Sequence, residues 1–184
     1  MAASSKECLL IIDTQRGLDD PSYGARSTPT AERNIARLLS AWRDASRPVL
    51  HVRHVSVRAT SPLRPGTPGV DFKPEAQPIA GEAVYDKSTN SAFIGTTLEH
   101  DLRARGIGAL VVAGLTTDHC VSSTVRTAAD LGFAVTVVSD ACATNERRGH
   151  DGLLVSAEDM HRSALASLSG EFAMVLDTDA VLAA

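Results

Sequence analysis

The sequence alternates short apolar runs with longer segments in which apolar residues recur every three or four positions. In the clearest such segment, Ile35, Leu38, Leu39 and Trp42 stand at positions i, i+3, i+4 and i+7, the spacing of one helix face. Periodicity of this kind, closed by Gly or Pro, predicts helices over residues 30–46, 96–105, 118–131 and 157–169. The apolar runs predict strands over residues 8–12, 49–57, 83–85, 109–113, 134–139 and 172–176.

Continuous apolar strands separated by helices are typical of a parallel sheet that is covered on both faces. With right-handed crossovers, this order predicts an α/β fold: a three-layer αβα sandwich around a doubly wound, mostly parallel sheet of about six strands. The 184 residues suit a single domain over 1–184. In such sheets, ligands bind beyond the carboxyl ends of the strands.

Composition narrows the possible partners. The chain is 43% hydrophobic and 22% charged, its formal net charge is -4, and no basic stripe is visible. Nucleic acid and anionic membrane are therefore not expected as partners. Three cysteines without close spacing predict neither a disulfide framework nor a structural zinc site. Residues 1–7 are short and polar, so we expect no signal peptide and a cytoplasmic location.

Three chemically useful residues follow predicted strands. Asp13 follows the first strand, Lys87 the third and Cys120 the fourth, so one crevice is expected to collect them. Cys120 would lie in the first turn of a helix, where free backbone N–H groups stabilise a thiolate. Each residue also has an ordinary interpretation: a turn cap for Asp13, a solvated surface lysine for Lys87 and a buried structural thiol for Cys120.

At these positions the sequence resembles the isochorismatase-like cysteine hydrolases, which include nicotinamidases and N-carbamoyl amidohydrolases. The Gly-Leu-Thr-Thr-Asp-His-Cys-Val segment that contains Cys120 is the strongest match. The resemblance runs from about residue 8 to 144, and more weakly to the end. The matching segments are LLIIDTQRG at 9–17, KSTNSAF at 87–93, GTTL at 95–98, VVAGLTTDHCVSSTVRTAADLGF at 111–133 and VVSDACAT at 137–144.

The resemblance implies that Asp13, Lys87 and Cys120 are the catalytic triad. It also implies a cis peptide between Leu115 and Thr116, with the backbone N–H groups of Thr116 and Cys120 as the oxyanion hole. The implied activity is hydrolysis of a C–N bond in a small amide or ureide through a thioester. No organic cofactor is implied, and a homo-oligomer is expected.

The sequence departs from nicotinamidases at their metal site. Their Asp-x-His motif after the second strand is absent, and His51 and His54 would point to opposite faces of a strand. We therefore predict no bound metal, a structural role for His51 and substrate contact for His54. Tyr23 and Phe93 are further candidates for substrate contact.

Residues 58–82 form a long loop that is expected to build part of the pocket wall. Arg16, Arg53 and Arg58 are candidates to bind a substrate carboxylate, although each taken singly suits a solvated charge. Asp118 is interpreted as a helix N-cap.

Other functions remain open at this point. The first is isochorismatase-type cleavage of an enol ether, which would release a pyruvate-like product instead of an amine. The second is a non-catalytic module that binds a small molecule on the same fold, for which an inert Cys120 thiol would be evidence. A nucleotide-binding domain is disfavoured, because no GxGxxG motif follows the first strand.

Overall fold

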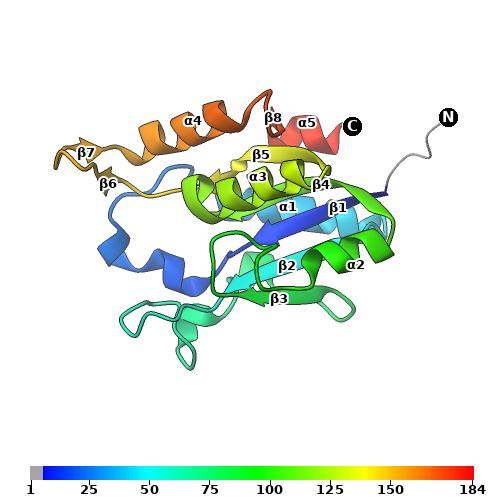
Figure 1. Cartoon of the computed structure of the whole chain (residues 1–184), viewed down its shortest axis with the longest axis horizontal. Coiled ribbons are helices and arrows are strands. Elements are labelled where there is room, and N and C mark those ends of the chain that lie inside the picture. The colour runs from blue at the N-terminus through cyan, green and yellow to red at the C-terminus, as the bar shows by residue number, and fades with distance from the viewer. Residues whose placement is uncertain (1–5) are drawn as a thin grey trace.

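The computed structural model describes residues 6–184; residues 1–5, part of the stretch in which we expect no signal peptide, lie outside the described residues. Six strands form one parallel sheet in the order β3-β2-β1-β4-β5-β8 (Figure 1). Helices cover both faces of this sheet, so the predicted doubly wound three-layer fold is confirmed. Within the described chain, no helix is long and apolar enough to span a membrane.

The elements follow one another as β-strands and helices in near alternation. The strands are β1 (Lys6–Ile12), β2 (Val49–His54), β3 (Ala83–Lys87), β4 (Ile107–Leu115), β5 (Ala134–Ala143), β6 (Arg147–Arg148), β7 (Leu154–Val155) and β8 (Met174–Leu176). The helices are α1 (Ala31–Asp44), α2 (Leu98–Ala104), α3 (Ser122–Asp130), α4 (Ala157–Leu168) and α5 (Thr178–Leu182).

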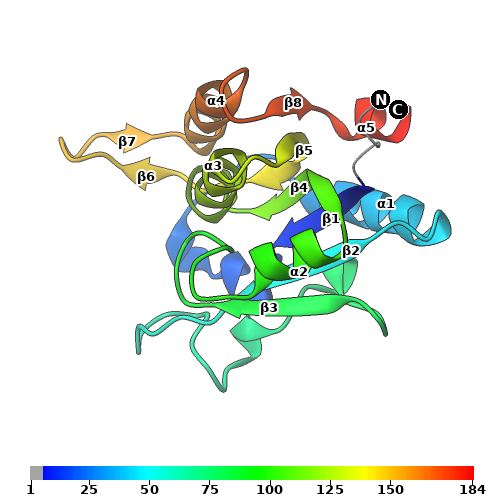
Figure 2. The same cartoon turned by 45° about the vertical axis from the view of Figure 1, so that its right-hand side comes forward.

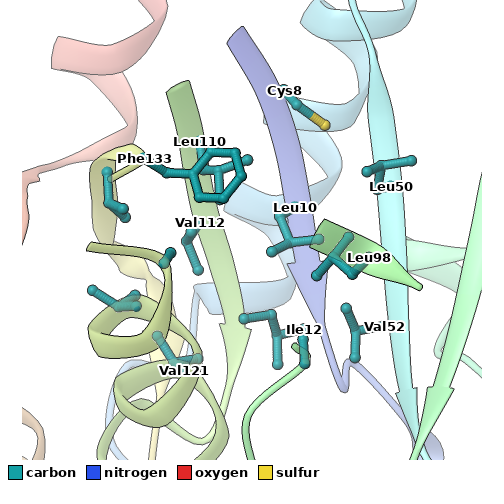
Figure 3. Packing of buried hydrophobic residues seen from close by; sticks show 14 of the residues in the cluster. Cys8, Leu10, Ile12, Leu50, Val52, Leu98, Leu110, Val112, Val121 and Phe133 are labelled. Atoms are coloured by element: carbon teal, nitrogen blue, oxygen red, sulfur yellow. The ribbon is translucent and has the colours of Figure 1, made fainter. Parts of the chain in front are cut away.

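The alternation of side chains along β1 divides the core between the two faces of the sheet. Leu10 and Ile12 point toward the layer of α2, α3 and α4, where they pack with apolar residues of β2 and β4 (Figure 3). Leu9 and Ile11 point the other way, toward α1 and α5. Every one of these β1 side chains is fully buried, which explains why the strand reads as a continuous apolar run.

Several boundaries differ from the predicted ones. Strand β2 ends at His54 and not at residue 57, because the chain then turns into the long loop and the N–H of Ser56 donates to Leu63 O. Strands β4 and β5 are longer than predicted. Helix α5 and the β6–β7 hairpin, which extends away from the sheet in Figure 2, are too short for a periodic signal and were not predicted.

Gly114 lets the end of β4 lie close to β1. Its φ is 133°, and a Cβ atom at this position would stand 2.0 Å from the carbonyl oxygen of Ile12. The pairing of β4 with β5 also shifts register between Val112 and Gly114. A glycine is therefore required near the carboxyl end of β4, just before the turn that follows this strand.

Candidate active site

The parallel register brings the predicted triad together at the carboxyl edge of the sheet. Asp13 follows the last residue of β1, and Lys87 is the last residue of β3. Between them, His54 ends β2 and pairs in register with Lys87. After β4 the chain forms a π-helical turn over Thr117–Val121, which carries Cys120, and only then becomes helix α3.

The ammonium of Lys87 lies at the centre of this group. Its Nζ donates to Asp13 Oδ2 at 2.6 Å, to the Thr89 carbonyl oxygen at 3.1 Å and to Cys120 Sγ at 3.3 Å, and it stands 3.2 Å from His54 Nδ1. The Lys87 side chain is fully buried, so water does not compete for these contacts. The solvated surface lysine is therefore excluded as an interpretation of Lys87.

Asp13 is held in an unusual environment for a carboxylate. The residue is 1% exposed and adopts a positive φ of 47°, a conformation that Asp tolerates better than most side chains. Its Oδ2 accepts from Lys87, whereas its Oδ1 is buried without a hydrogen-bond partner among residues 6–184. Burial raises the pKa of Asp13, and the Lys87 ammonium opposes that rise. An oxygen of this carboxyl group is thus left free to take part in proton transfer.

The thiol of Cys120 is not the stabilised thiolate that we expected from its place near a helix N-terminus. Burial and the Asp13 carboxylate raise the pKa of Cys120 to about 12, and Lys87 only partly offsets them. Backbone N–H groups and the Lys87 ammonium favour the thiolate, as expected, but burial and the negative charge of Asp13 next to the sulfur outweigh them. Before any substrate binds, Cys120 is therefore a neutral thiol beside a buried carboxyl group.

His54 is fixed on both its backbone and its ring. The side chain of Gln15 accepts from the His54 N–H at 2.8 Å and donates to the His54 carbonyl oxygen at 3.0 Å. Burial and the neighbouring Lys87 ammonium lower the pKa of His54, so its imidazole is neutral at pH 7. His51, by contrast, is buried on the other side of the strand with its Nε2 2.8 Å from Glu82, in agreement with a structural role.

A cavity of about 400 Å³ opens onto the thiol. Asp13, Cys120 and Thr116 line it, and the peptide bond between Leu115 and Thr116 is cis. The loop after β2 supplies part of its wall, as expected. From this loop, Arg58, Ser61 and Leu63 line the cavity. Tyr23 and His54, both expected to contact substrate, line it as well.

Phe93 does not belong to this wall, which corrects our expectation of substrate contact. Its ring packs in the core against Phe133, with the ring centres 5.9 Å apart, and it is absent from the cavity lining of the described chain. Of the three candidate arginines, Arg58 alone lines the cavity. Arg53 pairs with Asp86, and Arg16 donates to a loop carbonyl.

Asp118 is not a helix N-cap, because the turn begins one residue earlier, with Thr116 at the N-cap position. Its carboxylate instead accepts from Thr144 and, at 2.6 Å, from Arg147. Arg147 also contacts His119, and both residues line the cavity. Sequence reasoning missed Arg147, although this first residue of β6 comes shortly after the carboxyl end of β5, at the same end of the sheet as the predicted triad.

Three potential metal ligands also meet in the site. The ligand atoms of Asp13, His54 and Cys120 all lie within 4.8 Å of one another. These three residues differ from the Asp-x-His motif of nicotinamidases, which the sequence lacks. The Lys87 ammonium contacts all three residues and is the positive charge at the centre of this group.

Comparison with known proteins gives consistent matches along almost the whole chain. The family model of the isochorismatase domain matches residues 7–180. The isochorismatase family protein YrdC of Bacillus subtilis is 37% identical over 177 residues, which covers 96% of this chain and 95% of that protein. The crystal structure of an isochorismatase-family protein from Chromobacterium violaceum superposes with a TM-score of 0.95 at 49% identity, and the match covers 98% of this chain and 94% of that one.

Among more distant relatives are proteins named as hydrolases of particular compounds. Maleamate amidohydrolase of Pseudomonas putida is 28% identical and covers 85% of this chain and 81% of its own length. Streptothricin hydrolase of Streptomyces noursei is 33% identical over 75% of this chain, but this match covers only 50% of that protein.

Proposed function

Because the chain belongs to the isochorismatase family of hydrolases, we propose that its Asp13, Lys87 and Cys120 hydrolyse a C–N bond in a small amide or ureide. The observation that carries this proposal is the buried Lys87 ammonium, which contacts both the carboxylate and the thiol. Relatives named as amidohydrolases support the choice of a C–N bond.

The reaction begins when Cys120 Sγ attacks the substrate carbonyl carbon and its proton passes to Asp13. Collapse of the tetrahedral intermediate breaks the C–N bond, and Asp13 returns the proton to the leaving amine, which gives a thioester. Water activated by Asp13 then hydrolyses the thioester and restores the thiol. The backbone N–H groups of Thr116 and Cys120 stabilise the oxyanion in both halves of the reaction.

The charges of the site suit this order of events. A thiol whose pKa is raised to about 12 keeps its proton until the substrate arrives, so attack and proton transfer are expected to be coupled. Burial raises the pKa of Asp13, which makes this carboxyl group a better base than an exposed one. The positive charge of Lys87 balances a single negative charge, whether that charge is on the Asp13 carboxylate or on the Cys120 sulfur.

The cavity bounds the substrate to a small molecule. Its volume of about 400 Å³ is at the lower end of the usual range for ligand pockets. Among its charged residues, Arg58 has no acidic partner within the described part of the chain, whereas Arg147 is paired with Asp118. A substrate that carries a carboxylate near Arg58 therefore fits this pocket better than a cationic one.

The test is release of ammonia or amine from a panel of small amides and ureides, with and without a carboxylate. Cys120→Ala should abolish release, whereas Cys142→Ala, which removes a thiol buried in the core, should retain it. Release by Cys120→Ala at the wild-type rate would refute the mechanism. Formation of a pyruvate-like product from an enol ether, without amine release from any amide, would favour the other reaction class.

A further inference from the structure

The residues around the Lys87 ammonium form a site that binds a cation. A carboxylate oxygen, an imidazole nitrogen and a sulfur surround its Nζ at 2.6, 3.2 and 3.3 Å. These three atoms belong to Asp13, His54 and Cys120, and one ligand atom from each of these residues lies within 4.8 Å of one from each of the others. The ammonium thus occupies the position from which a single metal ion would reach all three ligands.

The site also has an unused acceptor. Asp13 is 1% exposed, and its Oδ1 has no hydrogen-bond partner in the described chain. A buried carboxylate oxygen without a partner is costly, and a second cation contact would relieve that cost. This oxygen is a further acceptor atom that a bound cation would contact.

The ligand types select among metals. Thiolate and imidazole ligands favour Zn²⁺, whereas Mg²⁺ requires oxygen ligands. Zinc binds sulfur, nitrogen and oxygen at roughly 2.0 to 2.3 Å, which places tetrahedral ligands about 3.5 Å apart. Three ligand atoms already within 4.8 Å of one another reach that geometry with small side-chain movements.

We propose that Asp13, His54 and Cys120 form an inhibitory zinc site, in which Zn²⁺ displaces the Lys87 ammonium and binds the nucleophile. The Cys120 S–H bond breaks, its proton goes to solvent, and a Zn–S bond forms; Lys87 keeps its proton and moves away. Zinc binding is independent of the proposed hydrolysis, and only the inhibition rests on that function. Because the ammonium competes for the same place, Lys87 also limits how tightly the metal binds.

The experiment measures Zn²⁺ affinity of the full chain by competition with a chromophoric zinc indicator. We expect one zinc ion per chain in the wild type, and at least tenfold weaker binding for Cys120→Ala and for His54→Ala. The matched control is His100→Ala, which removes an exposed histidine from α2 and should leave the affinity unchanged. Lys87→Met, which removes the competing ammonium, should bind zinc at least tenfold more tightly.

Cobalt provides a second readout that does not depend on the lysine variant. Co²⁺ bound to wild type should show a thiolate charge-transfer band that Cys120→Ala lacks, because Cys8 and Cys142 are fully buried. The proposal is overturned if the wild type binds no zinc, or if Cys120→Ala and His54→Ala bind it as tightly as the wild type. If a folded Lys87→Met protein binds zinc no more tightly than the wild type, zinc does not displace the Lys87 ammonium, and that part of the proposal is wrong. Hydrolysis retained by Cys120→Ala would instead refute the proposed function and leave these affinities as they are.

Discussion

Replacing Asp13 with Asn is expected to make the Cys120 thiol more reactive toward an alkylating agent while it abolishes amide hydrolysis. The two effects have one cause. The Asp13 carboxylate raises the pKa of Cys120, so its removal favours the thiolate, which remains beside the Lys87 ammonium. The same substitution removes the base that accepts the thiol proton during attack.

The size of the effect follows from the distance between the two groups. The ligand atoms of Asp13 and Cys120 lie within 4.8 Å of each other. At an effective dielectric constant of about 20, two unit charges at about that distance repel each other by roughly 3.5 kcal/mol. At about 1.4 kcal/mol per factor of ten, the thiolate fraction rises about 300-fold. A less basic thiolate is a weaker nucleophile, and a Brønsted coefficient of about 0.45 leaves a net gain of about 25-fold in alkylation rate.

The assay follows modification of Cys120 by iodoacetamide at one fixed, mildly alkaline pH, with the labelled peptide quantified by mass spectrometry. Cys8 and Cys142 are fully buried and should remain unlabelled, and Cys120→Ala provides the blank. Thermal melting of Asp13→Asn checks that the variant is folded. If the folded variant alkylates no faster than the wild type, the Asp13 charge does not control the thiol, and the reasoning fails.

Three further predictions concern the scaffold, the pocket and pH. Gly114→Ala should lower the free energy of unfolding by about 3 kcal/mol, measured in urea, because its Cβ would stand 2.0 Å from Ile12 O; a loss below 1 kcal/mol would contradict this. Arg58→Gln should raise KM for carboxylate-bearing substrates only, whereas Arg64→Gln, outside the cavity lining, should not. In a profile of kcat/KM against pH, activity should fall at low pH as Asp13 becomes protonated. Because burial raises the pKa of Asp13, this fall should occur above the pH range of an ordinary carboxyl group. A fall at or below that range would argue against Asp13 as the base.

The layers of the fold, and the convergence of the three predicted triad residues, could be predicted from the sequence. Alternation of apolar strands and helices defines a doubly wound sheet, and such a sheet places the residues that follow its strands at one edge. Asp13, Lys87 and Cys120 could be grouped by that rule alone. Arg147 follows β5 at the same edge, so the same rule would have found it.

Side-chain direction and charge balance could not be read in the same way. Phe93 turns into the core because Phe133 offers it an apolar surface, and nothing in its local sequence distinguishes this from a pocket wall. The pKa of Cys120 depends on the distance to a carboxylate more than 100 positions away in the chain. Asp118 lost its predicted cap role because the turn starts as a π helix, which local residue preferences do not reveal.

The position of β3 at one side of the sheet affects how the activity of the protein responds to heat. This strand lies at the edge and, within the described chain, pairs with β2 alone, yet it supplies Lys87. Edge strands detach in local fluctuations that leave the central strands intact, and their amide hydrogens then exchange sooner with solvent. Detachment of β3 would withdraw the ammonium from Asp13 and Cys120 while β1 and β4 still hold both residues in place. Catalysis is thus expected to be lost on heating before the sheet itself melts.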